Sequence, residues 1–309
     1  MAKVRLLLNL LPQFLIKRKF DYNLAVDGLR QILWGLFKKV VIADQCAEYA
    51  NQIFNNSADY SGSTLVLGAI FFTFQIYGDF SGYSDIAIGT SRLFGFDLMQ
   101  NFNFPYFSRD IAEFWRRWHI SLSTWFRDYV YIPLGGNRTL KWKWYYNLFV
   151  TFLISGLWHG ANWTFVIWGA LHGIFLILAI VFNQKGEEKN TSTFKYLIKN
   201  IWVFMLVLLG WVFFRANSVN EGFYIVKTIV SSSWSISQIF TPIGSNNVYN
   251  LDLMLSCFWI LGLLFFEAAY FFNWNRFKIA NKPAMISIGI IIIFLFGVFE
   301  SKQFIYFQF

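Results

Sequence analysis

The chain has 309 residues, of which 56% are hydrophobic, 22% aromatic and only 14% charged. A soluble globular protein carries about 25% charged residues, so this composition excludes water as the main solvent of the fold. The net charge of +9 comes from basic clusters between apolar stretches, and no base-stacking or groove-reading module accompanies them. We therefore predict an integral membrane protein that contacts an anionic lipid bilayer and binds no nucleic acid.

The first predicted helix begins at Asp21, a favourable N-cap residue, and runs to about Asn55 with apolar residues at helical spacing. A polar turn, Asn56–Gly62, separates it from the next apolar segment, Ser63 to Phe96. That segment is a candidate for spanning the bilayer, because a spanning helix needs roughly 17–25 mostly apolar residues.

The polar sequence YGDFSGYSD, residues 77–85, interrupts this apolar segment. Its carboxylates and hydroxyls would be costly in lipid, and irregular backbone at membrane depth is tolerated only where protein or a wet cavity satisfies it. Two interpretations are open: an irregular stretch that lines a cavity, or a simple loop between two short helices. On the first interpretation, Asp79 and Tyr83 are candidate lining residues.

An amphipathic helix is predicted from Ser108 to Tyr131, lying along a membrane interface or dipping into the protein. Aromatic residues recur on one side and charged residues on the other. In such a helix Arg116 and Ser123 lie one turn before and after His119, so the three share a face. His119 is either part of a reactive site or a solvent-facing interfacial histidine.

Residues Trp144 to Gln184 contain no Asp, Glu, Lys or Arg and are long enough for two spans joined by a tight turn. His159 lies near that turn, where Trp158 and Trp163 are able to wall it. An imidazole within a membrane is a candidate general base, or else a hydrogen-bonding group that joins helices. For the third histidine, His172, we favour packing against Trp168 and Phe175.

Three more spans are predicted at Asn200–Phe214, Leu251–Phe272 and Pro283–Phe299, which makes about six in all. Lysines and arginines flank both ends of the hairpin, so both ends are expected on the cytoplasmic side. The two cysteines, Cys46 and Cys257, form no CxxC pair, and no disulfide framework, zinc site or other metal site is expected.

Two long motifs resemble the signature regions of the membrane-bound O-acyltransferase superfamily: RRWHISLSTWFRDYVYIPLGGNR, Arg116–Arg138, and SGLWHGANWTFVIWGALHG, Ser155–Gly173. The segments QIYGDFSGYSDIAIG, WVFFRA and FIYFQF are similar to its bacterial branch for alginate O-acetylation. The resemblance implies an all-α polytopic fold, with helices around a central tunnel, in a single domain over residues 1–309. Members are usually longer, so the chain is expected to correspond to their C-terminal two-thirds.

The resemblance also implies residue roles. His159 matches the catalytic histidine and His119 the second motif histidine, while Arg127 and Asp128 match a shared pair with a structural or supporting role. Donor and acceptor cannot meet in hydrocarbon, and a protein-walled passage would protect the acyl group from water. Its candidate lining residues are Trp158, Asn162, Trp163, Arg116, Ser123, Arg127, Asp128, Asp79 and Tyr83.

The activity implied is transfer of an acetyl group from cytoplasmic acetyl-CoA to an extracytoplasmic polysaccharide across the bacterial cytoplasmic membrane. No bound cofactor is expected, and an extracytoplasmic, esterase-like acetyltransferase is the implied partner. D-Alanyl transfer to teichoic acid from a carrier protein is a related activity that the motifs also allow. Two functions of a different kind stay open: a transporter with His119 and His159 as proton-relay groups, and a non-enzymatic scaffold for polysaccharide export.

Overall fold

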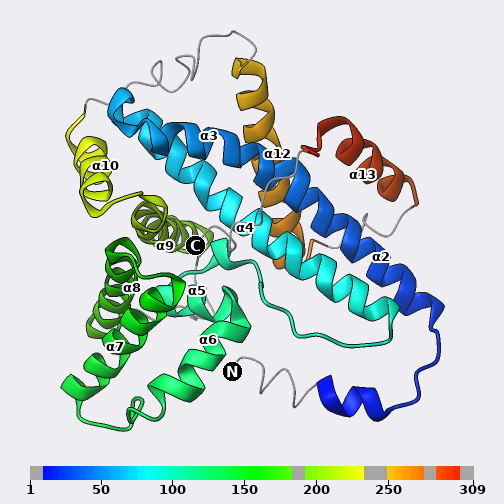
Figure 1. Cartoon of the computed structure of the whole chain (residues 1–309), viewed down its shortest axis with the longest axis horizontal. Helices are drawn as coiled ribbons and strands as arrows, with labels where there is room; N and C mark the ends of the chain where they lie inside the picture. The colour runs from blue at the N-terminus through cyan, green and yellow to red at the C-terminus, as the bar shows by residue number, and fades with distance from the viewer. Residues whose placement is uncertain (1–9, 183–191, 233–248, 275–282, 300–309) are drawn as a thin grey trace. The chain divides into compact units, whose positions relative to one another are not determined.

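The computed structural model describes residues 10–182, 192–232, 249–274 and 283–299, and within these ranges it contains helices and no β-strand (Figure 1). The all-α prediction is confirmed. The chain forms two compact units: Met1–Gln52, Phe71–Asn101 and Phe240–Gln308 make the first, while Ile53–Ile70 and Phe102–Ile239 make the second. Most of the predicted loop 183–193 and the FIYFQF tail lie outside the described residues.

Within the described ranges, four helices are long and apolar enough to cross a membrane: α4 (Gly62–Leu93), α8 (Trp163–Val181), α9 (Thr193–Arg215) and α12 (Tyr249–Phe271). The remaining two predicted spans are also helical, as α7 (Lys141–His159) and α13 (Pro283–Phe296). The multi-pass character of the chain is therefore clear, and a total of six spans stays a prediction.

In the first unit, α2 (Tyr22–Leu36), a π-helical turn (Phe37–Ala43) and α3 (Asp44–Asn55) follow one another without a break. The Asp21 carboxylate caps the start, because it accepts a hydrogen bond from the backbone N–H of Leu24 at 3.0 Å. The helix predicted from Asp21 to about Asn55 is confirmed.

Helix α4 passes without interruption through the polar sequence at residues 77–85, so both interpretations of that sequence are wrong. The preceding helix supplies the missing partners: Lys39 pairs with Asp79 at 2.6 Å, and Lys38 pairs with Asp85 at 2.5 Å. The Lys38 ammonium also donates to the Ser81 hydroxyl at 2.9 Å. Contacts from the preceding helix therefore provide partners for Asp79, Ser81 and Asp85 within a continuous helix.

Glycines bring α2 close enough to α4 for these pairs to form (Figure 1). A Cβ atom added at Gly35 would lie 2.6 Å from the carbonyl oxygen of Gly82, a distance that real Cβ atoms do not show. Helix α4 is also joined to α12, because the Tyr77 hydroxyl donates to the buried Glu267 carboxylate of α12 at 2.5 Å. Glu267 thus faces protein, as its position in an apolar span requires.

In the second unit, α7 and α8 form the predicted hairpin, with a short turn at residues 160–162 (Figure 1). Close helix contact depends on Gly156 and Gly169, where a Cβ atom would collide with the carbonyl oxygens of Phe165 and Phe152. Helix α9 packs on α8, and α10 (Val219–Ser231) packs on α9.

The helix predicted from Ser108 to Tyr131 is wrong as a single element. It is divided into α5 (Ile111–Arg117), α6 (Ile120–Phe126) and a π-helical turn, Arg127–Tyr131. The break lies at Trp118, whose backbone is extended and whose indole is buried 5.1 Å from the Trp211 ring centroid. Burial of this large ring in the core outweighs continuation of the helix.

Candidate functional site

The second unit brings together the two histidines of the signature motifs. His159 is the last residue of α7, and His119 precedes α6 with a left-handed backbone, φ 40°. The pKa of His119, which lies outside the four spanning helices, is lowered to about 3, first by burial and then by the nearby His159. His119 is therefore a neutral imidazole at physiological pH, held in a conformation that non-glycine residues seldom adopt.

Aromatic rings surround His159 on several sides. The ring centroids of Trp158, Trp168 and Phe214 each lie 5.1 Å from that of His159, and Phe165 lies 6.2 Å away. Three of these rings are buried, whereas Trp158 is exposed and His159 itself is half-buried. The imidazole therefore lies against a packed aromatic core, and the residue is partly exposed at the end of α7.

The predicted lining residues of the hairpin lie at its turn. Trp158 and Trp163 are exposed, at 53% and 73% of their surface. Asn162 caps α8, because its side-chain oxygen accepts from the backbone N–H of Thr164 at 3.1 Å. Trp158 contacts His159, while the role of all three in lining a passage stays a prediction.

The remaining predicted lining residues are spread more widely. Arg116 is exposed at the end of α5, and the Arg127 guanidinium donates to the adjacent Asp128 carboxylate at 2.8 Å. The Ser123 hydroxyl donates to the Trp118 carbonyl oxygen at 3.0 Å, which stabilises the break between α5 and α6. Because of that break, the expectation that Arg116, His119 and Ser123 share one helix face is wrong.

Asp79 and Tyr83 belong to α4 in the first unit. Asp79 is buried in its ion pair with Lys39, whereas Tyr83 is exposed. Three rings at His159 were not predicted as part of the site: Trp168, Phe214 and Phe165. The signal that could have found them was their place in the SGLWHGANWTFVIWGALHG and WVFFRA segments, both of which carry the resemblance.

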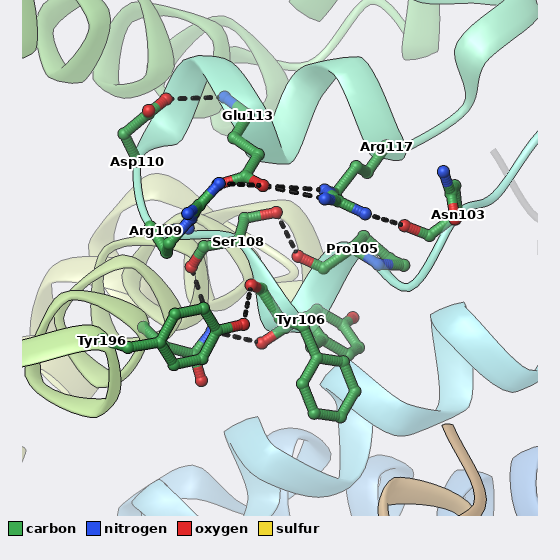
Figure 2. Close-up of polar contacts among 11 residues, drawn as sticks. Asn103, Pro105, Tyr106, Ser108, Arg109, Asp110, Glu113, Arg117 and Tyr196 are labelled. Atoms are coloured by element: carbon green, nitrogen blue, oxygen red, sulfur yellow. Dashed lines mark hydrogen bonds and ion pairs between the residues drawn. The ribbon is translucent and has the colours of Figure 1, made fainter. Parts of the chain in front are cut away.

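A buried ion cluster precedes His119 in the chain (Figure 2). The Glu113 carboxylate, only 2% exposed, accepts from the guanidinium groups of Arg109 at 3.1 Å and Arg117 at 2.8 Å. It also accepts from the backbone N–H of Arg109 at 2.9 Å, while Asp110 caps α5 through the Glu113 N–H. Asp110 and Glu113, two members of the predicted charged side, are both buried.

Side chains of α9 donate hydrogen bonds to the backbone just before this cluster, at residues 106–108 (Figure 2). The Tyr196 hydroxyl donates to the Phe107 carbonyl oxygen at 2.6 Å. The Asn200 amide donates to the carbonyl oxygens of Tyr106 at 2.7 Å and Ser108 at 3.0 Å. Because α9 also carries Phe214, these bonds join the His119 segment to a helix that contacts His159.

His172 packs against Trp168 and Phe175, as predicted. Its ring is fully buried, and neither ring nitrogen has a hydrogen-bond partner among the described residues. Gly210 makes room for it, since a Cβ atom there would lie 2.7 Å from His172 Nε2. Across the part of the chain that the structure describes, no group of three or more His, Cys, Asp or Glu side chains is placed to hold a metal ion.

The apolar helices and the interhelical ion pairs define a multi-pass membrane protein, and the two motif histidines of its second unit form a candidate acid–base site. The chain belongs to the membrane-bound O-acyltransferase (MBOAT) family, whose model matches residues 17–221. This match covers both histidine motifs and all of α4 and α9.

The chain is also similar in sequence to several named proteins. The chain is 45% identical to the "Probable alginate O-acetylase AlgI" of Azotobacter vinelandii over 69% of its own length and 42% of that protein. It is 35% identical to the "Peptidoglycan O-acetyltransferase" of Helicobacter pylori over 97% of its length and 60% of that protein. It is 29% identical to the "Teichoic acid D-alanyltransferase" of Streptococcus thermophilus, over 69% of the chain and 54% of that protein. The chain spans about half the length of the curated relatives that it matches.

The lowered pKa of His119 predicts a pH-dependent stability. An unfolded histidine has a pKa of about 6.5, so the unfolded chain binds a proton first as the pH falls. Stability is then unaffected above this value and is lost progressively as the pH falls from about 6.5 toward 3. We expect the unfolding temperature in detergent to fall less between pH 7 and pH 5 in His119→Asn, because asparagine tolerates the left-handed backbone and does not titrate. An equal fall in both proteins would contradict the prediction.

Proposed function

We propose that the chain is an O-acetyltransferase that moves an acetyl group from acetyl-CoA, on the cytoplasmic side, to a hydroxyl group of an extracytoplasmic polysaccharide. The observation that carries this proposal is that both motif histidines lie in the second unit, with His159 against an aromatic core, in a chain of this family. The proposed location is the bacterial cytoplasmic membrane, with an esterase-like acetyltransferase as partner outside it.

His159 acts as the general base in this proposal. It removes the proton from the acceptor hydroxyl, whose oxygen attacks the thioester carbonyl carbon. The new C–O bond forms, the C–S bond breaks, and the proton passes from His159 to the departing thiolate of coenzyme A. His119 supplies a second neutral imidazole, suited to hold the acyl carbonyl or the acceptor hydroxyl. Water is kept from the thioester by a passage that includes Trp158, Asn162 and Trp163.

D-Alanyl transfer is the second candidate, because two relatives are named teichoic acid D-alanyltransferases. Acetyl transfer is favoured by the higher identity to the relatives named as O-acetylating proteins, 45% and 35% against 29% and 32%. The acceptor glycan is proposed only as a class, a polysaccharide with free hydroxyl groups.

The proposed function is tested by mass analysis of cell-surface glycans from cells with and without the gene. We expect an acetyl ester that disappears with the gene and returns when the full chain is supplied again. Membranes that contain the chain should also transfer radioactive acetyl from acetyl-CoA to isolated polysaccharide. An alanyl ester in place of the acetyl ester would support the second candidate, and unchanged glycans would refute both.

A further inference from the structure

The buried side of His159 is closed by three rings, Trp168, Phe214 and Phe165, which we call the aromatic floor. All three are buried, and they contact one another as well as the imidazole. The Phe165 and Phe214 centroids lie 4.9 Å apart, and those of Trp168 and Phe214 lie 5.3 Å apart. The floor is therefore a continuous layer of rings beneath the imidazole.

A second layer of rings supports the floor from below. Trp168 stacks on Trp211 with centroids 6.1 Å apart and meets the His172 ring edge-on at 5.1 Å. Phe165 is held through its backbone, since Gly156 lets α7 lie directly against its carbonyl oxygen. Protein interiors are packed as densely as organic crystals, so these rings cannot yield without disturbing the whole hairpin.

The distances that general-base catalysis by His159 requires leave little room for the acyl group. The acceptor hydroxyl must lie roughly 2.6–3.2 Å from the imidazole nitrogen, and the thioester carbon about 3–3.5 Å from the hydroxyl oxygen. The sugar and the coenzyme are both large, and the buried rings close one side of His159, so both have to approach from its partly exposed side. The substituent on the acyl carbon is therefore directed toward the aromatic floor.

We propose that the aromatic floor limits the acyl group to the length of acetyl, with Trp168, Phe214 and Phe165 as specificity-determining residues. This inference rests on the proposed function. A methyl group fits against the rings, whereas a longer chain has to displace them. One extra methylene in an apolar pocket changes discrimination between substrates by roughly 10–200-fold. We therefore expect acetyl to be preferred over butyryl, which is two methylenes longer, by at least about tenfold.

The test compares acetyl-CoA, propionyl-CoA and butyryl-CoA as donors for membranes that contain the full chain. Trp168→Phe, Phe214→Leu and Phe165→Leu each remove part of the floor. In these variants we expect the butyryl-to-acetyl rate ratio to rise by about tenfold or more, since a gap of one or two methylenes opens beside His159. Trp259→Phe, which shortens a buried tryptophan of the first unit, is the matched control, and its ratio should stay that of the wild type.

The outcomes separate this inference from the proposed function. A wild-type chain that transfers no acyl group from any donor refutes the proposed function. A wild type that transfers acetyl and butyryl equally well overturns the limit on acyl length. The limit is also overturned if a folded variant at any of the three positions keeps acetyl transfer without gaining butyryl transfer. A folded variant that loses transfer with all donors overturns it as well. Folding is judged by membrane abundance and by gel filtration in detergent. Because three positions are tested, the experiment remains decisive if one variant fails to fold.

Discussion

Replacement of His159 by alanine is expected to lower the proposed acetyl transfer by roughly 10²–10⁴-fold, the usual contribution of a general base, while the chain still inserts into the membrane. The reason is the position of the ring. It lies at the end of α7 and is only partly buried. The substitution therefore removes a proton acceptor without leaving a closed cavity in the core. The measurement is transfer of radioactive acetyl to polysaccharide, normalised to the amount of chain in the membrane.

Two controls distinguish a chemical role of His159 from a structural one. Free imidazole added to His159→Ala should restore part of the activity, because the vacated site is partly exposed. Lys227→Gln, an exposed position on α10 of the same unit, should behave like the wild type. Full activity of His159→Ala would refute the assignment of the base, and loss of the protein from the membrane would show a structural role instead.

Replacement of Glu113 by alanine is expected to destabilise the chain by about 3–5 kcal/mol, the cost of removing one partner from a buried ion pair. Glu113 is the common acceptor for Arg109 and Arg117, and both guanidinium groups are then left largely buried without it. Because this cluster lies directly before His119, acetyl transfer should become more heat-sensitive. The measurement is the free energy of unfolding in detergent, together with the half-life of activity on heating.

The matched control is the exposed pair between Asp27 and Arg92, in which the Asp27 side chain is 59% exposed. Asp27→Ala should cost at most about 1 kcal/mol, because exposed ion pairs contribute little. Glu113→Gln should fall between the two alanine variants, since it keeps hydrogen-bond acceptors but loses the charge. Equal effects of Glu113→Ala and Asp27→Ala would contradict the structural importance of the cluster.

Lowering the pH should remove the contribution of the Glu113 ion pairs to the stability of the folded chain. Burial by itself raises the pKa of Glu113, but its hydrogen bonds with Arg109 and Arg117 outweigh burial and hold the pKa below the usual 4.5. Because the folded-state pKa is the lower one, the stabilisation is complete above pH 4.5 and is lost as the pH falls through the folded-state value. The stability difference between the wild type and Glu113→Gln should therefore narrow at low pH.

Several features of this protein could be predicted from local sequence patterns. The scarcity of charged residues indicated a membrane protein, Asp21 marked the start of the first helix, and the uncharged run after Trp144 predicted the hairpin. The two histidine motifs indicated the family and the candidate site. Each of these signals depends on composition or on residues within a few turns of one another, so no knowledge of distant contacts was needed.

Only the tertiary structure decided the features that depend on partners far along the chain. Lys38 and Lys39 let α4 continue through its carboxylates, and burial of Trp118 beside Trp211 divides the helix predicted after Ser108. In the same way, the floor beneath His159 needs α9 to bring Phe214 against the hairpin. The periodicity of a sequence indicates which face of a segment is apolar. The free energy of an ion pair or a ring contact depends instead on which distant residue packs against that face.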